Sequence, residues 1–343
     1  MADVPNGSEG PPLSPMPAAD VSSSTGGPPL PPDTDAAASE YRGCVDSLPP
    51  MPAPDVAGVE RRGSGLFPSD GAGQGAPALP RLTGIVLTGN SQRLLERCLA
   101  SLSFCSDLLV VDSLSTDNSL EIARRHKARI LSRPWTDIGE QFTFALQHVD
   151  SEWIVILDSD EVCSRALADE IVRALADETA GAPAGPRPEG APDGYYIPRR
   201  SWYFDRFVKY AWRRPDMLYR LFRNGSVRIT MSGVHQTFHP VASFGHMRGE
   251  IVHYPYASFA NHLEKLNGYA RGGAADLAAA GERGGAVKAV GHAVWRFVRL
   301  YFLRLGFLDG RAGFILSCHA SFYVFLKYIR LLDASWGAPF DHE

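Results

Sequence analysis

Between residues 82 and 160 the chain alternates between short apolar segments and segments whose apolar residues recur at helical spacing. The apolar segments cover 82–88, 108–111, 129–131 and 153–157, and the helical patterns cover 91–102, 116–127 and 138–149. Such alternation is typical of a doubly wound, mostly parallel α/β sheet of the Rossmann-like kind. We therefore expect this architecture, with ligands bound at the carboxyl ends of the strands.

Polar residues stand at the C-terminal ends of three of the apolar segments. They are Thr88-Gly89-Asn90, Asp112-Ser113 and Asp158-Ser159-Asp160. Because the carboxyl ends of parallel strands meet at one edge of a sheet, we expect these side chains to share one site.

Asp158 and Asp160 are the candidate metal ligands. Two carboxylates separated by one residue can reach the same hard divalent cation through oxygen ligands. The cation would neutralise the charge that builds up on a diphosphate as it leaves. The alternative interpretation is that both acids only cap a helix near Cys163.

Asp112 ends the second apolar segment and also has two interpretations. Its carboxylate can accept a hydrogen bond from the imide N–H of a uracil ring, or it can form a turn. For Asp117, shortly after it, we expect a helix-terminus position.

Asp216 precedes a strand-like segment, 217–222, that contains Arg220. An attacking hydroxyl needs a base to take its proton, and a carboxylate beside a guanidinium that binds diphosphate suits that task. The alternative is a surface aspartate after a proline.

His235 lies on an expected loop that contains Gly233 and follows a strand-like segment. A neutral imidazole there can serve as a third metal ligand or contact a diphosphate, although a lone histidine is more often structural. Three further histidines lie nearby, but their spacings match no zinc motif. They are His239, His246 and His253.

Composition divides the chain into three parts. Residues 1–80 hold 16 of the 26 prolines and show no apolar periodicity, so we expect a disordered tail. Residues 81–256 form the expected catalytic domain, interrupted by a low-complexity loop over 179–193. Residues 257–335 form an expected helical extension, with helices near 258–280, 286–305 and 311–332.

Charge and cysteine content limit the partners. A net charge of −4 does not suggest a nucleic-acid partner, and five widely spaced cysteines suit a reducing compartment. No secretory signal is visible at the N-terminus, so a cytoplasmic location is expected. In the extension, basic residues alternate with large aromatic residues, which suits helices lying in a lipid headgroup layer. Its longest uncharged stretch, Ala312 to Leu326, is shorter than the ~20 residues that span a bilayer.

Together these segments resemble family 2 glycosyltransferases of the GT-A fold. The resemblance covers roughly residues 81–332, and several segments resemble the bacterial lipopolysaccharide-core β-1,4-glucosyltransferase branch. The segments of the first kind are 82–90, 110–117, 133–135 and 156–161, and those of the second kind are 196–200, 215–223, 234–235, 263–267, 306–313 and 323–328.

This resemblance implies an inverting hexose transfer, with glucose as the expected sugar, from a UDP-sugar donor. It implies a lipid-linked core oligosaccharide as acceptor and a peripheral position on the inner face of the plasma membrane. Mg²⁺ or Mn²⁺ would lie at Asp158 and Asp160, and Asp216 would be the base. The other implied donor or metal contacts are Thr88, Asn90, Asp112, Arg220 and His235, with Asp158 also facing the donor.

The chain departs from the family pattern at three positions. Gly89 and Ser91 stand where relatives carry Lys and Glu, and Gln236 stands where relatives tend to have Glu. If that Glu were the base, this protein would be impaired or would use another residue.

Three other functions remain open from the sequence. The first is the same chemistry on another acceptor, such as a polyprenyl phosphate or a peptide, since acceptor pockets lie in variable loops. The second is a catalytically silent sugar-nucleotide or glycan-binding protein. The third is a sugar-nucleotide pyrophosphorylase, which would want a Gly-rich, basic phosphate loop where Leu82 to Ser91 offers only Gly84 and Gly89.

Overall fold

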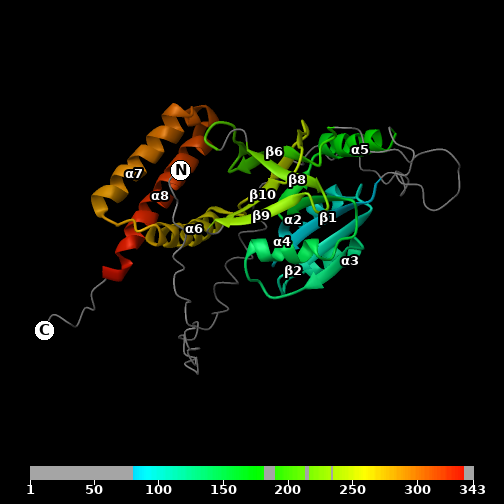
Figure 1. The fold of residues 1–343 in the computed structure, drawn as a ribbon. Coiled ribbons are helices and arrows are strands. Elements are labelled where there is room, and N and C mark those ends of the chain that lie inside the picture. Colours follow the sequence, from blue (N-terminus) through cyan, green and yellow to red (C-terminus); the bar gives the residue numbers. More distant parts are fainter. Residues whose placement is uncertain (1–79, 181–189, 213–215, 233–234, 336–343) are drawn as a thin grey trace, which may run out of the picture. The chain divides into compact units, whose positions relative to one another are not determined.

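The computed structural model describes residues 80–180, 190–212, 216–232 and 235–335, all within one unit, Ala53–Glu343 (Figure 1). The expected tail lies outside the described residues except for Pro80, and so does the 181–189 part of the expected loop. The boundary expected between 256 and 257 stays a prediction.

A parallel half-sheet comes first in the chain, as expected. Its strands lie in the order β3-β2-β1-β4, and every neighbouring pair is parallel. The strands are β1 (Leu82–Thr88), β2 (Asp107–Asp112), β3 (Arg129–Ser132) and β4 (Trp153–Asp158).

The sheet then continues past β4 as a mixed sheet. The order is β4-β8-β6-β12-β5, in which only β6 and β12 run parallel. These strands are β5 (Glu161–Cys163), β6 (Gly194–Tyr203), β8 (Met217–Arg223) and β12 (Ile251–His253), and two short strands also pair with β6, namely β7 (Arg206–Phe207) and β11 (Gly245–His246). A separate hairpin joins β9 (Val227–Ser232) to β10 (His235–Pro240).

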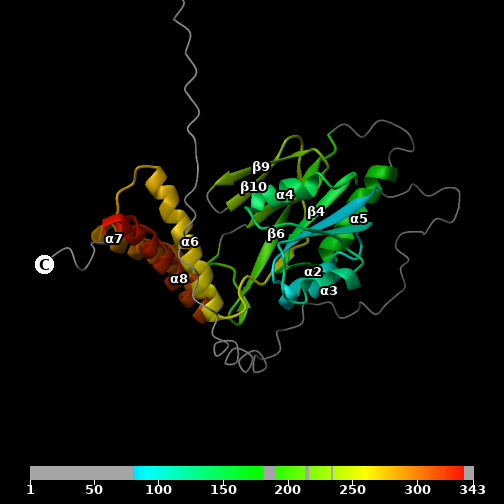
Figure 2. The same cartoon turned by 90° about the horizontal axis from the view of Figure 1, so that it is seen from below.

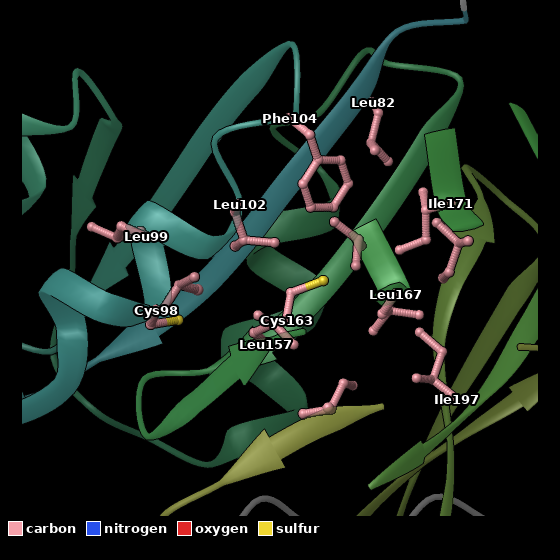
Figure 3. Packing of buried hydrophobic residues seen from close by; sticks show 14 of the residues in the cluster. Leu82, Cys98, Leu99, Leu102, Phe104, Leu157, Cys163, Leu167, Ile171 and Ile197 are labelled. Atoms are coloured by element: carbon pink, nitrogen blue, oxygen red, sulfur yellow. The ribbon is translucent and has the colours of Figure 1, made fainter. Parts of the chain in front are cut away.

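Helices cover both faces of the sheet, and alternate residues of each strand explain why. One core cluster gathers Val86 and Leu157 with residues of α2 (Gln92–Ser101), α3 (Ser119–Arg125) and α5 (Arg165–Ala180). Figure 3 shows Leu157 of this cluster together with Leu99 of α2 and Leu167 of α5. The other gathers Ile85 and Ile156 with α4 (Ile138–Leu146). Strands buried on both faces read as continuous apolar runs, and all seven residues of β1 are indeed buried.

Three helices follow the sheet, as expected. The first matches its expected range to within one residue at each end, whereas the second ends seven residues and the third three residues earlier than expected. They are α6 (Phe259–Ala279), α7 (Ala286–Val298) and α8 (Gly310–Ile329), with the turns η1 (Arg299–Leu303) and η2 (Gly306–Asp309) between α7 and α8, and η3 (Arg330–Ser335) after α8. Helices α7 and α8 lie side by side, and Ser321 Oγ donates to the Ala293 carbonyl (Figures 1 and 2). Among the described residues, Gly306–Leu332 is long and apolar enough to cross a membrane, judged by length and composition only.

The helical region is joined to the sheet by a buried carboxylate. Asp309 is 4% exposed, and its oxygens accept from the backbone N–H groups of Lys209, Tyr210 and Ala211 at 2.9, 2.7 and 2.7 Å. Beside this contact, Ala312 and Leu316 of α8 pack in one apolar cluster with Tyr203, Val208 and Ala211.

Candidate active site

The strand register brings three predicted site residues to one edge of the sheet. Thr88 lies opposite Asp112 on the neighbouring strand, and Leu87 lies opposite Asp158 on the other side. The Thr88 side chain is 4% exposed, and its Oγ1 has no hydrogen-bond partner among the described residues. A buried hydroxyl without a partner costs free energy, so this atom is available to a ligand.

The loops after β1 and β2 are bonded into one unit. Asn90 Oδ1 accepts from the backbone N–H groups of Thr116 and Asp117, at 2.8 and 3.3 Å. Asp112 is fully buried, and both of its oxygens accept from Ser115, one from the backbone and one from the hydroxyl. The turn-forming interpretation of Asp112 is therefore confirmed, and its contact with a uracil ring stays a prediction.

Asp117, not Ser91, satisfies the first N–H of α2. Ser91 occupies the N-cap position but makes no side-chain cap hydrogen bond. Asp117 Oδ2 accepts from Gln92 N at 3.0 Å, and Oδ1 accepts from Ser119 N at the start of α3. The helix-terminus interpretation of Asp117 is confirmed, at two helices at once.

Asp158 is the last residue of β4 and Asp160 lies on the turn to β5, and neither caps a helix in the described structure. Ser164 takes that role for α5, because its hydroxyl accepts from Leu167 N. Asp158 Oδ2 accepts from Arg220 Nη2 at 2.8 Å. The capping alternative for the two acids was therefore wrong, and both carboxylates are left for other partners.

Asp160 lies among further charged groups. Its oxygens are 3.6 Å from His253 Nε2 and 3.8 Å from Lys265 Nζ, the latter on α6. Burial, together with the negative charges of Asp158 and Glu161, raises the pKa of Asp160 to about 7. Burial, then the charge of Arg199, holds the pKa of His253 well below its usual range, so that imidazole is neutral.

A buried network of charges connects β4, β5, β6 and β8. Arg199 joins Glu161 to Asp216, with N···O distances of 3.0 and 2.8 Å, while Arg220 joins Asp158 to Glu161 more loosely, at 2.8 and 3.9 Å. Burial alone would lower the pKa of Arg199, but the two carboxylates outweigh it and that pKa is raised.

Asp216 is a buried member of this network rather than a surface residue. It is 7% exposed, so the surface alternative was wrong. Its Oδ2 accepts from Arg199 Nε, and Oδ1 has no hydrogen-bond partner among the described residues. On the other side of the network, Arg220 Nη1 is a buried donor that no described residue pairs with.

The carboxylate oxygens at this site fit a hard divalent cation as ligands. Asp158, Asp160, Glu161 and Asp216 bring four carboxylates together, and the nearby cations are Arg93, Arg199, Arg220 and Lys265. Asp160 forms no short ion pair with any of these cations, and burial is the main cause of its raised pKa. Oxygen ligands from the first two acids are those that Mg²⁺ and Mn²⁺ prefer. In the part of the chain that the structure describes, no three His, Cys, Asp or Glu side chains converge as a metal site.

His235 and Gln236 are placed by their backbone only. Both lie in β10 and pair with Ser232 and Met231 of β9. Their side chains lie outside what the structure describes, so the role of His235 stays a prediction. His239 is hydrogen-bonded to Thr230, and the His246 ring stacks on Tyr196.

Three charged residues of the site were given no role from the sequence. They are Glu161, Arg199 and Lys265, each ion-paired or close to an opposite charge in the structure. Glu161 directly follows Asp160, so an acid beside a metal motif was a usable signal. Arg199 lies 38 residues after Glu161, and Lys265 lies 105 residues after Asp160, so no local pattern indicates such pairings.

Comparison with known proteins shows which family the chain resembles. Residues 84–240 match the family model "Glycosyl transferase family 2". The chain is 28% identical over 264 residues to LpsC, a lipopolysaccharide core biosynthesis glycosyltransferase of Rhizobium meliloti, which covers 74% of this chain and 93% of LpsC. It is also 23% identical over 282 residues to an uncharacterized glycosyltransferase of Rickettsia typhi, covering 75% and 88%.

Similarity to solved structures is partial. TarS of S. aureus matches with a TM-score of 0.37 and 15% identity over 56% of this chain, which spans 39% of TarS. A glucosyl-3-phosphoglycerate synthase of Mycobacterium tuberculosis, solved with Mn²⁺ and UDP-glucose, matches with a TM-score of 0.24 and 21% identity, over 36% of this chain and 44% of the synthase.

The resemblance to family 2 glycosyltransferases that was inferred from the sequence is confirmed over residues 84–240. Its mixed α/β fold, with a mostly parallel first half-sheet and a C-terminal helical region, is the GT-A architecture that the sequence predicted.

Proposed function

We propose that the protein transfers a hexose, with inversion, from a UDP-sugar to a lipid-linked core oligosaccharide at the inner face of the plasma membrane. The observation that carries this proposal is the carboxylate pair Asp158 and Asp160 at the end of β4, beside the buried guanidinium of Arg220, in a family 2 domain.

The residues divide the work of donor binding. A divalent cation held by Asp158 and Asp160 would neutralise the leaving diphosphate. Arg220 supports the same task, since its unpaired Nη1 donor is buried beside Asp158 and can bind a phosphate oxygen. Thr88 Oγ1 offers a second unpaired group at the same sheet edge.

Asp216 is the proposed base. The acceptor hydroxyl oxygen forms the new bond to the anomeric carbon, the bond from that carbon to the diphosphate breaks, and the hydroxyl proton passes to the carboxylate. Arg199 fixes Oδ2, so Oδ1 is the atom that would take the proton. Gln236 offers no carboxylate for this step.

The proposed acceptor class rests on the similarity to LpsC, whose name assigns it to lipopolysaccharide core biosynthesis. Basic and aromatic residues of the C-terminal helices suit an acceptor that is anchored in a membrane. The expected location is therefore cytoplasmic and peripheral.

The test is release of UDP by the full chain from a panel of UDP-sugars, with Mn²⁺, Mg²⁺ or chelator. We expect metal-dependent release with one preferred sugar, and loss of that release in Asp158→Asn and Asp160→Asn with an unchanged circular dichroism spectrum. Asp150→Asn is the matched control, because Asp150 is exposed and precedes the same strand. Release that chelator leaves unchanged would refute the metal's role.

A second experiment identifies the acceptor. Labelled sugar should appear on truncated core oligosaccharide-lipid, and label only on polyprenyl phosphate or a peptide would refute this acceptor. No turnover with any donor, alongside measurable UDP binding, would favour the silent binding protein instead.

A further inference from the structure

An exposed apolar surface occupies the turn between α7 and α8. It consists of the side chains of Phe302, Leu303, Leu305, Phe307, Leu308 and Phe314, which are 43–62% exposed. Together with Arg299 and Arg304 they are called here the aromatic–arginine surface. A contiguous group of exposed apolar side chains marks an interaction site, whereas single exposed apolar residues are common on any protein surface.

Ring contacts show that this surface is continuous. The half-buried Tyr301 ring lies 5.1 Å from Phe302, 6.3 Å from Phe307 and 5.6 Å from Phe314, measured between centroids. Phe297 of α7 adds a further contact to Phe314, at 6.0 Å. The exposed rings therefore belong to one cluster.

The charge around the cluster has one sign. No Asp or Glu occurs between Ala286 and Leu308, and the next acid, Asp309, is turned inward onto the backbone of 209–211. The guanidinium groups of Arg299 and Arg304 are exposed, and neither has a carboxylate partner among the described residues. Arg311, by contrast, is neutralised by Asp205 at 2.8 Å.

We propose that the aromatic–arginine surface binds the headgroup layer of a bilayer that contains anionic phospholipids. Aromatic and leucine side chains would enter the boundary between headgroups and acyl chains, while Arg299 and Arg304 pair with lipid phosphates. This deepens the membrane location given in the proposed function by naming the residues that make the contact.

Two features favour headgroup contact over a spanning helix. The N-terminal end of α8 is fixed by Asp309 to the 209–211 backbone, and α8 buries Ala312, Leu316 and His319 against the rest of the protein. Crossing a bilayer would expose those buried groups and the freed backbone N–H groups to hydrocarbon, which costs several kcal/mol for each unsatisfied group.

Charge also disfavours a second copy of this chain as the occupant. In a symmetric dimer the same patch faces itself, so the unpaired guanidinium groups of Arg299 and Arg304 would meet their own copies. Like charges opposed across an interface oppose association. An anionic lipid layer supplies the opposite charge.

The experiment is co-sedimentation of the full chain with phosphatidylcholine vesicles that do or do not contain phosphatidylglycerol. We expect binding to the anionic vesicles only, weakened by salt, and weakened roughly fivefold for each arginine removed in Arg299→Gln and Arg304→Gln. The double variant Phe302→Ser with Phe307→Ser should weaken it by roughly tenfold or more. The matched control is Arg124→Gln with Arg228→Gln, two exposed arginines of the sheet domain, which should bind as the unchanged protein does.

Each other outcome overturns the proposal. Equal binding to neutral vesicles, or no effect of Arg299→Gln and Arg304→Gln, would remove the headgroup contact. Resistance to extraction at alkaline pH would indicate a spanning helix. Self-association without vesicles that Phe302→Ser with Phe307→Ser abolishes would indicate a second copy. UDP release without vesicles reports on the proposed transferase separately, and circular dichroism verifies that each variant is folded.

Discussion

Replacing Asp309 by alanine would remove the acceptor of three backbone N–H groups at once. Lys209 is exposed, so its N–H can bond to water instead, whereas Tyr210 and Ala211 are partly and fully buried. A hydrogen bond to a charged group contributes about 1.5–3 kcal/mol, and part of that gain is offset by the cost of burying the carboxylate. We therefore expect a loss of about 3 kcal/mol in the free energy of unfolding.

The assay is urea unfolding followed by circular dichroism, with hydrogen exchange at the Tyr210 and Ala211 amides. Asp309→Asn keeps one carbonyl oxygen and should lose about half as much. Asp205→Ala is the control, because its partners Arg206 and Arg311 are exposed and such pairs contribute about 0–1 kcal/mol. If Asp309→Ala costs no more than this control, the three hydrogen bonds do not join the helical region to the sheet as argued.

Two further predictions follow from buried ionisable groups. Arg199→Met leaves the buried carboxylates of Glu161 and Asp216 without their shared partner, so it should lower the free energy of unfolding, measured by thermal unfolding, by about 3–5 kcal/mol. Arg125→Met, at an exposed ion pair, should lower it by under about 1 kcal/mol. Burial, then His319, lowers the pKa of His262 to about 3. Because the unfolded chain binds that proton from about pH 6.5 downward, the stability from this group should be full above pH 6.5. Below it, the free energy of unfolding should fall by up to about 1.4 kcal/mol per pH unit. His262→Gln should lack this contribution, and an unchanged pH slope in that variant would refute it.

The first half of the fold could be predicted because its signals are local. Strands β1 and β4 are continuous apolar runs and α2 and α4 show helical periodicity, so both element type and order follow from short windows. The short strands β5 and β12 were harder, because three residues carry no periodicity. Their pairing, which carries Glu161 and His253 into the site, depends on contacts between segments about 90 residues apart.

For the site, too, local signals could be predicted from the sequence and contacts between distant segments could not. Asp158 and Asp160 were found because they directly follow a buried strand. The burial of Asp216 was not found, since it depends on Arg199 of a neighbouring strand. The hydrogen bond that Asp117 accepts from Gln92 N of α2 was likewise not found, since Asp117 lies 25 residues further along the chain, on a loop held by Asn90.

The buried charge network also limits which substitutions the site tolerates. Asp158, Glu161 and Asp216 are each balanced through Arg199 or Arg220, so a substitution at one member alters the cost of a substitution at the next. Variation at the site is therefore strongly epistatic. A library that randomises Asp216 alone would mostly return destabilised variants, whereas one that varies Asp216 together with Arg199 can reach more stable variants in which the role of the carboxylate is tested separately from its charge balance.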